Sequence, residues 1–353
     1  MLRTATLLAA ALALPLAGCA GSGLQVVKPP TPNSEHFDVA AAPSRAELRP
    51  AAIDEVLRAV RDEDPQMRAH ALEAIRPVAE RAVPMTQLAL EDENAAVRFT
   101  ALWVIGQERF TDLAPAVRPL FKRDQPDVVK AAVIYAATNT GTAREELISM
   151  MSRYVLHEDV RVRSTAAMLL GDMGEASAIP LLKQAARRPS DNRQPEILWD
   201  LMRVQAAEAM VKLGDGEAIK TIYGAAYSSD PEVQILATQT IARLDDLAFW
   251  ANMSKFLDDD PIELRVAAAE GLVRLSKLSG GRDMELLQDA VREGAIPVLL
   301  EAARSDIATV RGQAALALGL SNTAEARAAL AALLEDADAS VRLAAAGGVL
   351  LDA

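Results

Sequence analysis

The stretch DDDPIELRVAAAEGLVRL, from Asp258 to Leu275, contains a cluster of acids, a proline, an apolar–basic pair and a run rich in alanine. Leu264, Ala268 and Leu272 are four residues apart, which places them on one face of a helix. The alanine in the middle lets a neighbouring helix approach closely, because a larger side chain would hold the two backbones apart. The stretch therefore predicts a helix that begins after the acids and packs tightly along its apolar face.

The same apolar stripe recurs along the chain, and a basic or polar residue follows its first position in every copy. These following residues are Arg68, Arg98, Lys130, Arg163, Arg203, Gln234, Arg265, Arg311 and Arg342. A period of little more than thirty residues predicts stacked units, each of which buries its apolar face against its neighbours. We expect an all-α solenoid, a superhelix of about nine helix–turn–helix repeats.

The acids that precede most copies have a structural explanation as helix caps. An Asp or Asn at the N-cap accepts hydrogen bonds from free backbone N–H groups and favours the positive end of the helix dipole. Pro65, Pro231 and Pro261 are expected at the first helical position, where a missing N–H has no cost. Asp260 with Glu263, and Ser44 with Glu47, have capping-box spacing. A cation site is the alternative for the acids, but they lack the pattern of a calcium loop.

The turn acids, the apolar–Arg pair, the alanine and segments such as GAIPVLLEAAR together resemble the HEAT-repeat family, in a short Ala-rich bacterial form. The resemblance implies that turn acids and basic residues of neighbouring repeats form a ladder. Gln234 departs from the family pattern, and the repeat of Arg203 has no turn acid, so we expect an interruption there. The implied ladder members are Asp92 and Arg98, Asp124 and Lys130, Asp336 and Arg342, together with Arg163, Arg265 and Arg311.

The expected solenoid is an open rod or arc, on the order of 80 Å long for nine packed layers. No polar capping helix follows the last repeat, so its apolar face would need a partner. A second copy of the chain, bound through the C-terminal repeat, is one such partner. Longer spacings mark insertions at residues 187–200 and 276–294, the second with an extra amphipathic helix. Insertions fall on the rims of a solenoid, and these two carry either a recognition surface or neutral length variation.

The N-terminus resembles a bacterial lipoprotein leader. Arg3 precedes an apolar run that is shorter than the roughly 20 residues needed to span a bilayer. Leu16, Ala17, Gly18 and Cys19 match the lipobox. The resemblance implies a signal peptide at 1–18, a lipidated (palmitate-bearing) Cys19, a flexible tether at 19–43 and the solenoid at 44–353. An ordinary leader with an incidental cysteine is the alternative.

The predicted address is the bacterial cell envelope, with the protein anchored to the membrane by lipid. Ala20 follows the cysteine where Asp is the usual inner-membrane retention signal. In a diderm host the resemblance therefore favours the outer membrane, with the solenoid facing the periplasm.

Composition and motifs argue against nucleic-acid binding and against a catalytic function. The net charge of −12 is unsuited to a nucleic-acid binder. Deoxyhypusine hydroxylase, a HEAT-repeat enzyme, holds two irons with repeated His–Glu pairs, whereas this chain has the single pair His157–Glu158. We therefore expect no catalytic residue, metal or cofactor. The predicted function is a non-catalytic scaffold that binds another envelope protein through its solenoid surface. The alternatives are a HEAT-like enzyme or cofactor-handling protein similar to a lyase, and a structural self-assembling lipoprotein.

Overall fold

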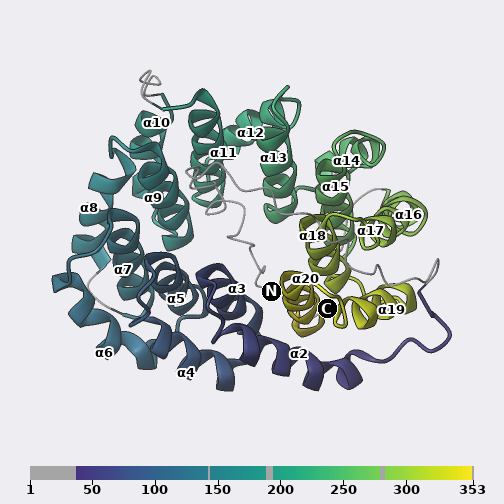
Figure 1. The fold of residues 1–353 in the computed structure, drawn as a ribbon. Coiled ribbons are helices and arrows are strands. Elements are labelled where there is room, and N and C mark those ends of the chain that lie inside the picture. The colour runs from purple at the N-terminus through teal and green to yellow at the C-terminus, as the bar shows by residue number, and fades with distance from the viewer. Residues whose placement is uncertain (1–36, 142–143, 188–193, 279–282, 352–353) are drawn as a thin grey trace, which may run out of the picture.

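The structure, a computed structural model, describes residues 37–141, 144–187, 194–278 and 283–351. These residues form helices and turns, and none of the described ranges contains a β-strand. The helices alternate between an inner and an outer layer (Figure 1). The predicted α-solenoid of HEAT-like helix pairs is confirmed.

The helices that carry the apolar stripe form the inner layer (Figure 1). In the described part of the chain they are α3 (Pro65–Ile75), α5 (Ala95–Glu108), α7 (Asp127–Asn139), α9 (Val160–Met173), α11 (Glu196–Lys212), α13 (Pro231–Arg243), α15 (Ile262–Leu275), α18 (Ala308–Gly319) and α20 (Ala339–Leu350). Each packs against the next one along the chain.

The outer layer fills the grooves between successive inner helices. Its helices are α2 (Arg45–Ala59), α4 (Ala79–Ala89), α6 (Ala114–Val117), α8 (Arg144–Val155), α10 (Ile179–Arg187), α12 (Ile219–Ala225), α14 (Trp250–Phe256), α17 (Ile296–Ala302) and α19 (Ala324–Leu333). Short 3-10 turns precede several of them, for example Thr111–Leu113 before α6 and Leu247–Phe249 before α14. The insertion at 276–294 contains the extra helix α16 (Met284–Ala290), followed by a π-helical turn, Val291–Ala295.

The stripe positions are buried in every repeat, and the alanines at their centres, such as Ala71 and Ala268, are completely buried. Glycines bring some inner helices closer still. A Cβ atom placed on Gly319 of α18 would lie within 2.6 Å of the Gly348 carbonyl oxygen of α20. Because no side chain fits there, the two backbones touch, and this is the close helix approach that the small residues predict.

The solenoid closes on itself, which corrects the expected open arc. The last inner helix, α20, packs against both α2 and α3, so that the inner helices form a complete ring (Figure 1). Helix α2 takes the outer position between α20 and α3, as α4, α8, α12, α17 and α19 do between their two inner neighbours. We call this junction the seam. It covers the apolar face of α20, which removes the reason for expecting a homo-oligomer through the C-terminal repeat.

Several polar contacts hold the closing segment, which we define as Phe37–Ala59, against the C-terminal repeats. The Arg45 guanidinium donates to the carbonyl oxygens of Leu351 (2.5 Å), Ser321 (2.9 Å) and Gly319. These carbonyls lie at the ends of α18 and α20, where the helix dipoles favour a cation. The last part of the predicted tether, residues 37–43, also lies against the ring, because Arg327 donates to the Pro43 carbonyl oxygen at 3.0 Å.

Two details of helix capping can be compared with their predictions. Ser44 and Glu47 form the expected capping box at the start of α2. The prediction for Asp260 and Glu263 was wrong, because Pro261 is the N-cap of α15 and no side chain caps this helix. The Asp260–Pro261 peptide bond is cis. Pro65 and Pro231 occupy the first helical positions of α3 and α13.

Candidate functional site: the turn edge of the ring

In the described part of the chain, the turns that lead from outer to inner helices lie at one edge of the ring, which we call the turn edge (Figure 1). Their geometry follows from the caps. The side chains of Asp64, Asn94, Asp159, Asp230 and Asp338 each accept a hydrogen bond from the backbone N–H two residues further on. This satisfies one of the free N–H groups at each helix start. The caps fix the backbone of these turns and so the direction of the neighbouring side chains.

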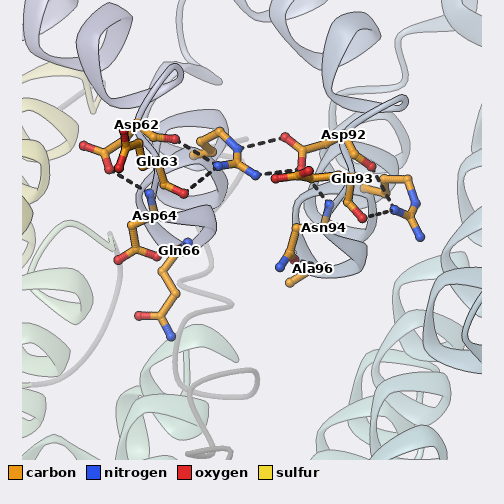
Figure 2. A network of polar contacts seen from close by, with 10 residues as sticks. Asp62, Glu63, Asp64, Gln66, Asp92, Glu93, Asn94 and Ala96 are labelled. Atoms are coloured by element: carbon orange, nitrogen blue, oxygen red, sulfur yellow. Dashed lines mark hydrogen bonds and ion pairs between the residues drawn. The ribbon is translucent and has the colours of Figure 1, made fainter.

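One arginine joins two successive turns in the clearest rung of the ladder (Figure 2). The Nε and Nη2 atoms of Arg68 donate to the two carboxylate oxygens of Asp92 at 2.8 and 2.9 Å. Its Nη1 atom donates to the carbonyl oxygens of Asp62 (2.9 Å) and Glu63 (3.0 Å) in its own turn. A planar guanidinium suits this position, because it bonds a carboxylate on one edge and carbonyls on the other. Arg311 repeats the arrangement with Asp336 and the Ser305 carbonyl oxygen.

The rung on Asp92 also determines its protonation. Burial opposes the charged carboxylate, but the hydrogen bonds from Arg68 and the Asn94 N–H outweigh burial, and the pKa of Asp92 is lowered. The same contact raises the pKa of Arg68. The pair is therefore fully ionised at neutral pH and holds two repeats in register.

Several other junctions use different partners for the same purpose. Their cross-repeat contacts are Arg98 with Gln125 (3.0 Å), Asp127 with His157 (3.3 Å), Arg163 with the Trp199 ring (4.7 Å to its centroid), Arg265 with Glu301 (2.8 Å) and Arg342 with Glu55 (3.1 Å). The Arg342–Glu55 contact lies at the seam, so the ladder continues across it. Arg203 instead pairs with Asp200 and Glu196 of its own repeat.

The structure places the predicted ladder residues at the turn edge, and at Arg68–Asp92 and Arg311–Asp336 it joins an arginine to the turn acid of the neighbouring repeat. The carboxylates of Asp92 and Asp336 accept hydrogen bonds from the arginine of the preceding repeat. Arg98 and Arg342 of their own repeats donate to the backbone carbonyl oxygens of Asp92 and Asp336, and not to their carboxylates. Lys130 lies 3.9 Å from Asp124, whose side chain is fully exposed. The packing of successive repeats brings the turn acid of one repeat to the arginine of the repeat before it. Residue spacing within a single repeat cannot reveal which acid and which arginine meet.

The expected interruption is bridged on one side only, because Arg163 reaches the repeat of Arg203, whereas Arg203 itself pairs within its own repeat. Arg163 is completely buried, donates to the His157 carbonyl oxygen at 2.5 and 3.0 Å, and stacks on Trp199, which stands where other repeats have an acid. A cation over the face of an indole ring is attracted by its quadrupole. Sequence reasoning missed Trp199, Gln125 and Glu55 as ladder partners. Glu55 lies in the middle of a helix, and no sequence signal could have identified it.

The exposed charges of the turn edge are mainly acidic, because its arginines are engaged in the ladder. Among the described residues of these turns, the exposed acids are Glu63, Asp64, Glu91, Glu93, Asp124, Glu158, Asp258, Asp259, Asp260, Asp306 and Glu335, and the exposed bases are Arg61, Lys122, Arg123 and Arg304. Figure 2 shows the first two of these turns side by side. The edge therefore presents negative charge to solvent in successive repeats.

A second polar network joins inner helices at the ends that lie away from the turn edge. Glu208 of α11 is 5% exposed and contacts Arg243 of α13 at 2.9 Å and Lys212 at 3.0 Å. Lys212 also contacts Asp172 of α9 at 2.8 Å, and Asp172 accepts a hydrogen bond from Gln107 of α5. Burial opposes the charge on Glu208, but Arg243 and Lys212 prevail and lower its pKa to about 2. This network is internally compensated, so we assign it to stability.

Among the described residues, no group of three or more His, Cys, Asp and Glu side chains is arranged to hold a metal ion. His157 accepts a hydrogen bond from the Asp159 N–H and contacts Asp127, which are structural roles. Within the described ranges, no helix has both the length and the apolar character to cross a membrane. Leu16, Ala17, Gly18 and Cys19 lie outside the described residues.

Comparison with known proteins agrees with this repeat structure. Residues 53–138 match the model of the HEAT repeats. This range extends from α2 to α7 and includes the Arg68–Asp92 rung. No curated protein matches the chain.

Three solved structures are similar to the HEAT-like ring. The karyopherin Kap121p is 14% identical (TM-score 0.37), and 84% of this chain covers 37% of Kap121p. Human deoxyhypusine hydroxylase is 15% identical (TM-score 0.36; 78% of this chain, 97% of that one), and the CpcE–CpcF complex of phycocyanin lyase from Nostoc is 16% identical (TM-score 0.38; 74% and 91%). At these identities and TM-scores the similarities carry no information about what this chain binds.

Proposed function

We propose that the protein is a lipid-anchored scaffold of the bacterial cell envelope that binds a partner protein with a basic surface at its turn edge. The row of exposed acids in successive turns carries this proposal. Charge complementarity of this kind directs an encounter and selects the partner more than it adds affinity. A ring of packed repeats holds the acids at fixed spacing, because the ladder and the caps immobilise the turn backbones.

The turn edge can be tested with charge reversal at side chains that have no structural contact in the turns. Glu63→Lys with Glu93→Lys changes two exposed acids while leaving the Arg68–Asp92 rung in place. The matched control is Glu80→Lys with Asp112→Lys, two exposed acids at the opposite edge. Proteins that co-purify from envelope extracts would be compared by quantitative mass spectrometry for wild type and both variants.

The proposal expects a partner that is retained by wild type and by the control but lost from the turn-edge variant, with binding that weakens as salt increases. Equal retention by both variants would contradict the assignment to the turn edge. Loss from both variants would point to net charge, and the turn edge would no longer be favoured.

The lipid anchor is proposed from Leu16 to Cys19 alone. Cys19→Ser should abolish incorporation of labelled palmitate and leave the precursor uncleaved by the lipoprotein peptidase, because the thiol accepts the lipid. Two or more acyl chains hold a protein stably on a bilayer. Fractionation of a diderm host would then place the wild type in the outer membrane. A wild-type protein that is soluble and begins at another residue would contradict the anchor.

A further inference from the structure

The seam differs from every other junction between described inner helices in its connectivity. Elsewhere, two neighbouring inner helices are joined by the chain segment that contains the outer helix between them, so they cannot separate far. At the seam, the contact between Arg342 and Glu55 joins residues 287 positions apart. Separating α20 from α2 and α3 therefore requires no repeat to unfold.

The backbone of α20 also approaches α3 across the seam less closely than it approaches α18 inside the chain. A Cβ atom on Gly347 of α20 would lie 3.4 Å from the Ala74 Cβ of α3, which is ordinary van der Waals contact. At the internal junction of α18 and α20, by contrast, a Cβ on Gly319 would collide with the Gly348 backbone. The α20–α3 contact therefore has no such close backbone approach to hold the two helices together.

The closing segment concentrates the polar contacts that oppose separation. Arg45 bonds three C-terminal carbonyl oxygens, Arg327 bonds Pro43, and the Arg304 guanidinium lies 4.3 Å from the centre of the Phe37 ring. The side chain of Glu55 is 6% exposed in contact with Arg342. Behind them, the completely buried Ala52 and Val56 of α2 lie in the apolar core.

We propose that the ring opens at the seam, and that the closing segment controls the opening. Release of Phe37–Ala59 uncovers the apolar face of α20 and leaves the other junctions intact. If Cys19 anchors the chain as proposed above, the segment that holds the ring closed is also the one nearest to the membrane attachment. The opening itself does not depend on that anchor.

Distance measurements between spin labels test the opening directly. In the full chain with Cys19→Ser, which removes the only natural cysteine, labels on Glu63→Cys and Ala337→Cys report on the seam. These exposed positions lie in the turns before α3 and α20. Labels on Asp306→Cys and Ala337→Cys report on the internal α18–α20 junction as the matched control. The closing segment is weakened by Arg45→Ala with Glu55→Ala.

The proposal expects a second, longer distance for the seam labels in the weakened variant, while the control labels keep one narrow distribution. An unchanged distribution for the seam labels would overturn it. So would equal broadening of both pairs, because that outcome means general loosening of the repeats.

A disulfide lock gives an independent measurement if the weakened variant is poorly folded. Ala74→Cys with Gly347→Cys spans the seam at a Cβ–Cβ distance suited to a disulfide. Gly312→Cys with Ala344→Cys is the matched internal pair, at 3.5 Å. Oxidation of the seam pair should restore the Tm of the weakened variant, and oxidation of the internal pair should not. Equal recovery with both pairs, or a seam pair that does not oxidise while the internal pair does, would overturn the proposal.

Discussion

The internal junction of α18 and α20 and the seam between α20 and α3 both hold two neighbouring inner helices together, but they do so through different contacts. At the internal junction, Arg311 meets the turn acid Asp336 in a bidentate pair, and two glycines bring the backbones into contact. At the seam, Arg342 pairs with Glu55 from the middle of α2, while Gly347 and Ala74 only touch. The comparison indicates that the backbones of α18 and α20 are packed more closely than those of α20 and α3, where the ring closes.

The largest difference is expected from removing the acid of each rung. Asp336→Ala leaves the guanidinium of Arg311 buried without its counter-charge, so the free energy of unfolding should fall by about 3 kcal/mol. Glu55→Ala should cost about half as much, because Arg342 is more exposed and keeps its two carbonyl acceptors. Urea unfolding of both variants measures this. A larger loss for Glu55→Ala would mean that the seam is the stronger junction.

Acid should weaken the internal junctions through Glu208. Its folded-state pKa of about 2 lies below the ordinary 4.5, so its stabilising contribution is present above pH 4.5 and is lost as the pH falls towards 2. The contribution amounts to at most about 3 kcal/mol, since one pKa unit corresponds to about 1.4 kcal/mol.

Unfolding free energies measured between pH 7 and pH 3 should therefore fall for wild type and vary less for Glu208→Gln. Parallel curves for the two proteins would show that Glu208 carries no part of the acid sensitivity.

Adding a methyl group to a glycine compares the packing of the two junctions. Gly319→Ala forces α18 away from the Gly348 backbone and should cost about 1–3 kcal/mol. The methyl group of Gly347→Ala meets Ala74 of α3 at 3.4 Å and the flexible end of Leu316 of α18 at 3.3 Å, which is slightly tight. A small shift of Leu316 and the better helix propensity of alanine offset this crowding. Thermal melts measure the Tm of the two variants, and equal decreases in Tm would contradict the looser packing of the seam.

The smallest effect is expected beside the seam at Glu73, a half-buried residue of α3. Burial raises the pKa of this carboxyl to about 8, against the opposing charge of Arg76. An acid with a raised folded-state pKa destabilises the protein progressively as the pH rises from about 4.5 to 8. Because Glu73 is half exposed, solvent screening reduces the effect of this shift on stability. Glu73→Gln should thus raise Tm by only roughly 1–2 °C at pH 9 and leave it unchanged at pH 4. A lower Tm at pH 9 would show that the charged form is stabilised instead.

Particular residues show which features of the structure could be predicted from the sequence. The stripe positions, the N-cap residues such as Asp64 and Asn94, and the buried central alanines follow from helix periodicity and capping, which are local rules. The partner of each arginine does not follow, because Arg68 and Asp92 meet only after two helices have packed. Trp199 illustrates the same limit, since a ring face replaces a carboxylate without leaving a recognisable motif.

By itself the sequence determined the repeat, its helical content, the buried face of each helix and the acidic character of the turns, since each depends on residues a few positions apart. Only the tertiary structure decided that the solenoid closes, that Glu55 completes the ladder and that Arg45 caps two distant helices. Closure depends on the small angle between successive repeats, summed over the whole ring. A change in that angle too small to alter any local pattern separates a ring from an open arc.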